Sequence, residues 1–213
     1  MNSALPIVYI VDDDSAVRES LSWLVASANL ETSAFASAEA FLKAYDRSRP
    51  ACLVLDLRMP GMSGLELQER LMRDRVDVPT IIVTGYGEVP TAVRAMRAGA
   101  VDFIEKPYRD EQILACIRTS IWRDIRARTS TQRIQKLRLQ VRDLTPRESQ
   151  VMKRVVHGMA NKRIASDLKV TEKTVEFHRG RVMKKFGIKS VAELVRIALI
   201  TDELAEEHGK HLV

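Results

Sequence analysis

Short apolar segments rich in β-branched residues alternate with amphipathic segments over the first 125 residues of the chain. The apolar segments predict strands at Ile7–Val11, Thr32–Ala36, Cys52–Asp56, Thr80–Thr84 and Val101–Glu105. The segments between them repeat apolar residues at spacings of three and four, which predicts helices at Ser15–Ala28, Ala38–Tyr45, Leu65–Arg73, Thr91–Ala98 and Gln112–Arg123. Strands and helices in alternation form parallel βαβ units, so we expect an α/β domain whose sheet is covered by helices on both faces.

Polar side chains follow most of these strands, at the sheet edge where ligands of such domains bind. In chain order they are Asp12, Asp13, Asp14, Asp56, Thr84 and Lys106. Each one alone has another explanation as a helix cap or a turn residue. Caps do not explain why all of them gather at the same end of different strands, so we expect a polar site there.

These residue types suit chemistry on a phosphoryl group. Clustered carboxylates repel one another unless a cation neutralises them, and oxygen ligands suit Mg²⁺, which we expect to bridge Asp13, Asp56 and a phosphoryl oxygen. Asp56 is the predicted nucleophile, because a carboxylate can accept a phosphoryl group as an acyl phosphate. Lys106 and the Thr84 hydroxyl are expected to hold the other phosphoryl oxygens.

The pattern is helical from Thr145 onward. Thr145–Glu148 is a capping box with proline at the first helical position, and a helix-turn-helix is predicted at Asn161–Gly180, with Thr171 capping its second helix. The period of this second helix turns Val175, His178, Val182 and Phe186 inward. The residues that it turns outward, where they could contact DNA, are Lys173, Thr174, Glu176, Phe177, Arg181 and Lys184.

Charge is distributed unevenly along the chain. Residues 1–120 carry 13 Lys and Arg against 17 Asp and Glu, whereas the remaining residues carry 21 against 11. A basic second half is typical of a polyanion-binding domain, although a basic helix is also often only a solvated surface.

Residues 121–142 connect the two halves. Ile113, Ile117, Ile121 and then Ile134, Leu137 and Val141 keep spacings of three and four. This predicts one long helix interrupted at Thr129–Thr131. It is either a solvated linker or, in an active dimer, a two-stranded coiled coil that includes Leu137 and Val141.

The first half closely resembles the receiver domain of response regulators. The motifs that carry the resemblance are VDDD (Val11–Asp14), VLDLRMPGMSG (Val54–Gly64), TGYG (Thr84–Gly87) and DFIEKP (Asp102–Pro107). It implies a flavodoxin-like fold with strand order 2-1-3-4-5. By this match Asp56 is the phosphoacceptor, Asp12 and Asp13 form an acidic pocket, and Arg58 lends its backbone carbonyl to Mg²⁺.

The same resemblance implies a switch. Thr84 and Phe103 match a pair in which the hydroxyl moves toward the phosphoryl group and the ring turns inward behind it. The Lys106–Pro107 bond is a candidate for cis, which would direct the lysine toward the pocket.

The second half resembles LuxR-type helix-turn-helix domains. The matching segments are LTPRES (Leu144–Ser149), NKRIASDL (Asn161–Leu168) and KTVEFHRGRVMKKFGIKS (Lys173–Ser190). The resemblance implies an all-α domain of four helices, whose third helix enters the major groove and whose fourth forms a dimer contact through Leu194, Ile197, Ala198 and Leu199. Glu176 departs from the basic residue of many relatives, and its carboxylate either accepts a bond from a cytosine amino group or repels phosphate.

Together the two resemblances identify a response regulator of the NarL group, FixJ subfamily. We expect a receiver at residues 1–125, a helical linker at 126–142 and a DNA-binding domain at 143–213. The expected partners are a cognate sensor histidine kinase, double-stranded promoter DNA, RNA polymerase and a second copy of the phosphorylated chain. The expected location is the cytoplasm, because the first residues lack a signal-type segment and no apolar segment is long enough for a membrane.

Three other functions fit parts of the sequence. A Mg²⁺-dependent phosphohydrolase could use Asp56 as its nucleophile, but all four histidines follow residue 150, which leaves the first half without a histidine acid or base. A pseudo-receiver that binds proteins without being phosphorylated is disfavoured by the complete set of acids, threonine and lysine. An RNA-binding antiterminator is disfavoured by the LuxR-type segment. We therefore expect no enzymatic turnover beyond self-phosphorylation and slow self-dephosphorylation.

Overall fold

The computed structural model describes residues 5–85 and 89–209 of the 213-residue chain, so Tyr86 and Gly87 of the TGYG motif lie outside the described residues. The chain divides into two compact units, Met1–Arg128 and Thr129–Val213. No helix among the described residues is long and apolar enough to span a membrane.

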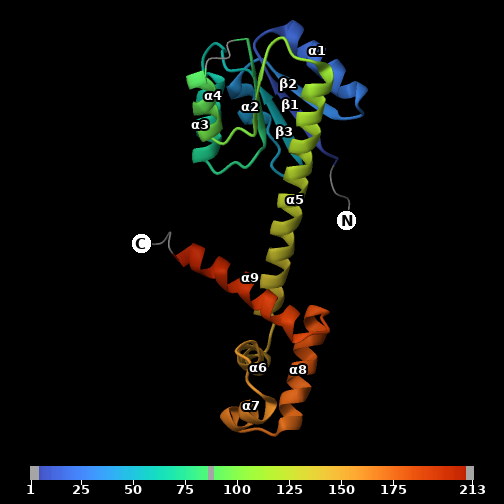
Figure 1. Cartoon of the computed structure of the whole chain (residues 1–213), viewed down its shortest axis with the longest axis vertical. Coiled ribbons are helices and arrows are strands. Elements are labelled where there is room, and N and C mark those ends of the chain that lie inside the picture. Colours follow the sequence, from blue (N-terminus) through green and yellow to red (C-terminus); the bar gives the residue numbers. More distant parts are fainter. Residues whose placement is uncertain (1–4, 86–88, 210–213) are drawn as a thin grey trace. The chain divides into compact units, whose positions relative to one another are not determined.

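Five parallel strands form one sheet in the first unit, in the order β2-β1-β3-β4-β5 (Figure 1). The strands are β1 (Ile7–Val11), β2 (Glu31–Phe35), β3 (Ala51–Leu55), β4 (Thr80–Thr84) and β5 (Asp102–Glu105). The predicted order is confirmed, and each strand begins and ends within one residue of its predicted bounds. All residues of β1, β3 and β4 are buried, as expected for strands covered on both faces.

Helices cover both faces of this sheet. They are α1 (Ser15–Ser27), α2 (Ala38–Ala44), α3 (Gly64–Arg73), α4 (Val89–Arg97) and α5 (Asp110–Arg142). Helix α1 and the N-terminal half of α5 bury Leu21, Val25 and Ile117 against one face, and α2, α3 and α4 pack on the other (Figure 1). Side-chain caps from Asp14, Ser37 and Ser63 begin α1, α2 and α3, which explains where these helices start.

Helix α5 runs without interruption from Asp110 to Arg142, so the predicted break at Thr129–Thr131 is wrong. Serine and threonine each cost only a few tenths of a kcal/mol in a helix, up to about 0.7 kcal/mol, and the stretch contains neither glycine nor proline. The flanking helical residues therefore stabilise a continuous helix across this stretch. The boundary between the two units falls inside this helix.

A buried carboxylate fixes α5 to the first unit. Oδ2 of Asp124 accepts hydrogen bonds from the backbone N of Ala51 at 2.8 Å and from Nε of Arg128 at 2.7 Å. Nη1 of Arg128 also donates to the carbonyl of Arg47 at 2.7 Å. These bonds set the register of α5 against the start of β3.

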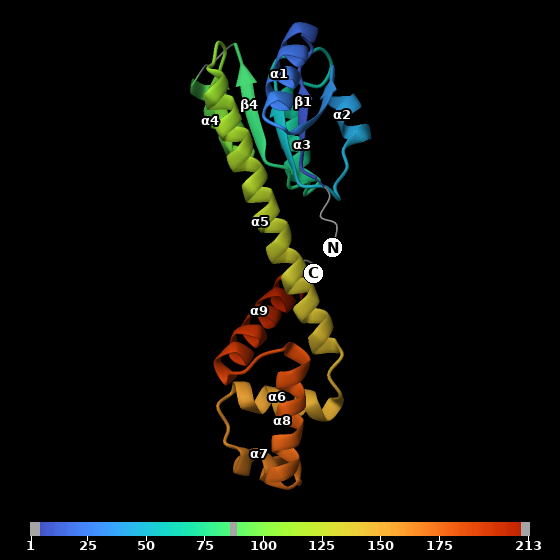
Figure 2. The same cartoon turned by 90° about the vertical axis from the view of Figure 1, so that its right-hand side faces the viewer.

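The second unit contains the helices α6 (Pro146–Val156), α7 (Asn161–Leu168), α8 (Glu172–Phe186) and α9 (Val191–Gly209), together with the C-terminal part of α5 (Figure 2). Its core is formed by buried apolar side chains, which include Val151, Val155, Ile164, Val175, Val182 and Leu194. The predicted capping box at Thr145 and Glu148 is present, and Thr171 caps α8. Gly187, at φ 65°, ends α8 in the left-handed conformation that suits glycine.

Candidate functional site

Strand pairing brings Asp12 and Asp56 to the same edge of the sheet. Val11 pairs with Leu55, and the backbone N of Asp56 donates to the carbonyl of Val11 at 2.8 Å. The residues that follow these two strand ends are therefore neighbours. On the other side of β3, the backbone N of Lys106 donates to the carbonyl of Thr84 at 2.8 Å, which places Lys106 beside the end of β4.

The ammonium group of Lys106 bridges the two aspartates. Its Nζ donates to Oδ2 of Asp12 at 2.7 Å and to Oδ1 of Asp56 at 3.0 Å. Both aspartates are buried, with 3% and 8% of their surface exposed. Each remaining carboxylate oxygen accepts a backbone N–H, from Asp14 at 2.9 Å and from Arg58 at 2.6 Å. The prediction that these strand ends converge is confirmed for Asp12, Asp56 and Lys106.

Burial decides the charge properties of this cluster. Desolvation raises the pKa of Asp56, and the hydrogen bond and charge of Lys106 offset only part of that rise. Desolvation lowers the pKa of Lys106, but its bonds to Asp12 and Asp56 outweigh that effect, so its pKa is raised overall. Lys106 is therefore protonated, and the carboxylate of Asp56 beside it is easier to protonate than that of an ordinary aspartate.

The loop after β3 is held tightly against Asp56. The backbone N of Gly64 donates to the carbonyl of Leu57 at 3.0 Å, and a Cβ at Gly64 would collide with the carbonyl oxygen of Asp56. Only glycine permits this approach, which explains the last residue of the VLDLRMPGMSG motif.

The other predicted residues of this site are placed differently. Asp13 and Arg58 have exposed side chains, and Asp14 caps α1 through a 2.8 Å bond from Ala16 N, as the alternative interpretation held. Thr84 is buried at the end of β4, and Phe103 is half-buried against the core beneath α2, α3 and α4. Within the described residues no group of three acidic, histidine or cysteine side chains is arranged to hold a metal ion. The Lys106–Pro107 bond is cis, as predicted.

A second candidate site lies on α8. Val175, Val182 and Phe186 are buried and His178 is half-buried, as the period predicts. The outward residues are exposed, except Thr174, which is partly buried and whose hydroxyl lies 2.8 Å from that of Thr171. Phe177 is 59% exposed.

Sequence reasoning missed the partner of Arg181. Its Nε lies 3.3 Å from Oε1 of Glu148, and Nζ of Lys185 lies 2.6 Å from Oε2 of the same carboxylate. The bond from Lys185 and the capping bond from the Thr145 backbone hold the pKa of Glu148 at about 2. The capping box identified Glu148 only as a local feature of α6, because no pattern in the sequence joins residues this far apart.

The predicted dimer contacts need correction. Leu194, Ile197 and Ala198 are buried in the core of the second unit, so they are not available to a second chain. Periodicity finds the apolar face of a helix but does not tell whether that face meets its own core or a partner. The exposed apolar side chains on the described part of α9 are Leu199 and Ile200.

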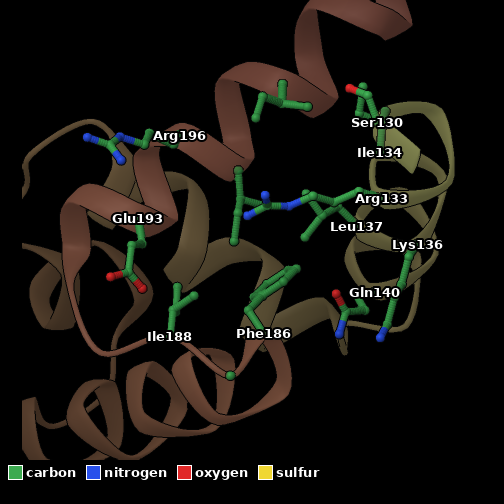
Figure 3. Close-up of a pocket in the computed structure, with 13 residues that line it drawn as sticks. Ser130, Arg133, Ile134, Lys136, Leu137, Gln140, Phe186, Ile188, Glu193 and Arg196 are labelled. Atoms are coloured by element: carbon green, nitrogen blue, oxygen red, sulfur yellow. The ribbon is translucent and has the colours of Figure 1, made fainter. Parts of the chain in front are cut away.

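The C-terminal part of α5 lines a groove of about 790 Å³ in the second unit (Figure 3). Ser130, Arg133 and Leu137 lie on one side, and Arg196 of α9 lies on the other. Leu137 and Val141 pack against the core of their own unit. A coiled coil through these two residues is therefore not available while that packing persists.

Two domain families match the chain. The response regulator receiver domain matches residues 8–118, and the bacterial regulatory proteins of the luxR family match residues 142–198.

Full-length relatives are similar over most of the chain. The response regulator protein TodT of Pseudomonas putida is 42% identical over 197 residues, which cover 92% of this chain and 87% of TodT. The transcriptional regulatory protein FixJ of Rhizobium meliloti is 44% identical over 192 residues, covering 90% of this chain and 94% of FixJ. The solved structure of the response regulator StyR aligns with a TM-score of 0.83 at 39% identity, over 92% of this chain and 98% of StyR.

Proposed function

Because this chain belongs to the FixJ-like transcriptional response regulators, with a receiver domain and a LuxR-type DNA-binding domain, we propose that Asp56 is its phosphoacceptor. The observation that supports this most strongly is the position of Lys106 between Asp12 and Asp56. A cation 3.0 Å from the Asp56 carboxylate is placed to contact an oxygen of a phosphoryl group bonded to it.

The donor in this proposal is a phosphohistidine of the cognate sensor histidine kinase. A carboxylate oxygen of Asp56 attacks phosphorus, the P–N bond breaks, and its electron pair remains on the imidazole, which takes up a proton. Asp56 becomes an acyl phosphate. Water later hydrolyses it to the carboxylate and inorganic phosphate, and we propose no other enzymatic activity.

The donor set at Asp56 suits Mg²⁺. Asp12 and Asp56 lie close enough to share one ammonium group, so this point of the sheet edge attracts positive charge. We propose that the ion is held by the carboxylates of Asp12, Asp13 and Asp56 and by the backbone carbonyl of Arg58, once the exposed side chain of Asp13 turns toward the other two. When bound, Mg²⁺ offsets the negative charge of an incoming phosphoryl group.

Thr84 and Phe103 are the proposed switch. The carbonyl of Thr84 accepts a bond from the backbone N of Lys106 at the carboxyl edge of the sheet, and Phe103 lies on the neighbouring strand β5. Movement of the hydroxyl toward the phosphoryl group lets the ring turn inward, which changes the surface of α4 and β5. That change favours a homodimer, to which Leu199 and Ile200 of α9 add exposed apolar surface.

The proposed output is binding to double-stranded promoter DNA. Helix α8 enters the major groove, and its exposed or partly exposed residues make the contacts: Lys173, Thr174, Glu176, Phe177, Arg181 and Lys184. Two domains of a dimer then match two half-sites, from which the protein acts on RNA polymerase in the cytoplasm. The proposed functional domains are residues 1–125 and 143–213, joined by residues 126–142.

DNA binding with and without phosphorylation tests the proposal. Wild-type chain treated with Mg²⁺ and acetyl phosphate should bind the duplex selected from a random library more tightly than untreated chain. Asp56→Asn should lose that stimulation, whereas Asp74→Asn, which changes an exposed aspartate of the same unit, should keep it. Equal stimulation of the Asp56 variant would contradict the proposal.

A further inference from the structure

A buried carboxylate of α6 joins two cations of α8. Glu148 is fully buried, and its Oε2 accepts bonds from the backbone N of Thr145 at 2.9 Å and from Nζ of Lys185 at 2.6 Å. Its Oε1 lies 3.3 Å from Nε of Arg181, one turn earlier on α8. The charge of Glu148 is therefore shared between the two basic side chains.

Lys185 is held by more hydrogen bonds than Arg181. Nζ of Lys185 also donates to the carbonyl of Asp143 at 3.0 Å, and the carbonyl of Lys185 accepts a bond from Nε2 of Gln140 at 3.0 Å. These contacts fix Lys185 against the end of α5.

Arg181 is held more loosely. Its side chain is 54% exposed, and Oε1 of Glu148 forms no well-directed hydrogen bond within the described residues, so charge attraction dominates this contact. The guanidinium carbon of Arg181 lies 5.7 Å from the ring centre of Phe177, which also favours this position. The position of Arg181 therefore depends on the charge of Glu148, whereas Lys185 has a further bond that holds it in place.

We infer that Glu148 is a positioning residue for DNA recognition, which holds Arg181 beside Phe177 and limits the sequence-independent attraction of α8 to phosphate. The inference rests on the proposed function, since it requires that α8 faces DNA.

The net charge of Glu148, Arg181 and Lys185 supports this role. Arg181 and Lys185 carry two positive charges that Glu148 reduces to a net of one. Without the carboxylate charge, Arg181 is free to contact a phosphate, and such a contact strengthens binding to every sequence alike. The affinity for random DNA then rises more than the affinity for the selected sequence, because in the complex with the selected sequence Arg181 already has its position beside Phe177.

Glu148→Gln tests the inference, because glutamine keeps the capping box while it removes the charge. Binding of the full chain is measured against a short random-sequence duplex pool and against the duplex that wild type enriches from that pool, over a range of salt concentrations. One added phosphate contact makes the salt slope steeper by about 0.9, which is roughly five- to tenfold tighter binding to random DNA near 0.1 M salt. We expect this steeper salt slope and tighter binding to random DNA. The ratio of the affinity for the selected duplex to that for random DNA should fall by a similar factor. Glu193→Gln removes an exposed charge from α9 and should change neither quantity.

A double variant controls for destabilisation of the fold by the single change Glu148→Gln. Glu148→Gln combined with Lys185→Met leaves no buried unpaired charge and keeps the net charge of wild type. Because Arg181 is still released, the steeper salt slope and the weaker discrimination should persist.

A folded double variant with the salt slope and discrimination of wild type would overturn the inference while leaving the proposed function intact. The same changes in Glu193→Gln would assign them to net charge and would also overturn it. A wild-type chain that binds no duplex DNA would remove the proposed function and the inference together.

Discussion

Nζ of Lys106 lies 3.0 Å from Oδ1 of Asp56, and the same ammonium group lies 2.7 Å from Oδ2 of Asp12. One cation thus holds two buried carboxylates at the carboxyl edge of the sheet. A change to any of the three groups alters the electrostatic balance of the other two.

Lys106→Ala should destabilise the first unit by about 1–3 kcal/mol, because it leaves two buried carboxylates without their shared cation. Added Mg²⁺ should restore part of this loss if the ion binds the same carboxylates. Hydrogen exchange of the β3 amides measures the local stability. Arg94→Ala is the control, because its ion pair with Glu69 is exposed and should contribute less than about 1 kcal/mol. Equal losses in the two variants would contradict the bridging role of Lys106.

Without added Mg²⁺, the carboxyl group of Asp56 should titrate above the range of an ordinary aspartate, whose pKa is about 3.9. The carboxylate form of Asp56 is the proposed nucleophile, and burial raises its pKa, so a larger fraction is protonated at a given acidic pH. Lys106 lowers this pKa, so Lys106→Ala should move the midpoint to still higher pH. The carbon chemical shift of the Asp56 carboxyl group, followed by NMR across the acidic range in the metal-free protein, measures both midpoints. A midpoint that stays or falls in the variant would exclude this electrostatic coupling.

Much of this first site could be predicted because its residues follow strand ends. The pattern of apolar strands and amphipathic helices determines which edge of a parallel sheet Asp12, Asp56 and Lys106 share. The ammonium bridge between the two aspartates was not predictable, because it depends on side-chain conformations and not on spacing.

The second unit shows where sequence periodicity stops being informative. Periodicity located the buried face of α8. The dimer contact implied by the resemblance to LuxR-type domains was assigned to Leu194, Ile197 and Ala198, which belong to the core of their own unit. The contacts of Glu148 with Arg181 and Lys185 come from tertiary packing of α6 on α8, which no local pattern encodes.

Gly64→Ala should destabilise the first unit by about 1–3 kcal/mol and slow the phosphorylation of Asp56. The added methyl group would collide with the carbonyl oxygen of Asp56, so the loop that carries Arg58 must shift. Gly85→Ala is the control for stability, because a Cβ there meets nothing within 4 Å. Hydrogen exchange of the β3 amides compares the variants, and a Gly64 variant as stable as wild type would show that the loop yields freely.

Lys184→Ala and Phe177→Ala should affect DNA binding in different ways. The exposed ammonium of Lys184 suits a phosphate contact, so its loss should weaken binding to all sequences and reduce the salt slope by about one. The exposed ring of Phe177 suits contact with a base edge, so its loss should change the order of preferred sequences. Binding to a panel of duplexes measures both effects, with Lys189→Ala as a basic control outside α8. Identical profiles for the two variants would rule out these separate roles.

Phosphorylation of Asp56 is tested by the intact mass of wild type and Asp56→Asn after incubation with Mg²⁺ and acetyl phosphate. We expect a gain of one phosphoryl group in wild type and none in the variant. A wild-type chain that gains no phosphoryl group from acetyl phosphate or from any sensor histidine kinase tested, or a variant that gains one as readily as wild type, would contradict the role of Asp56 as phosphoacceptor.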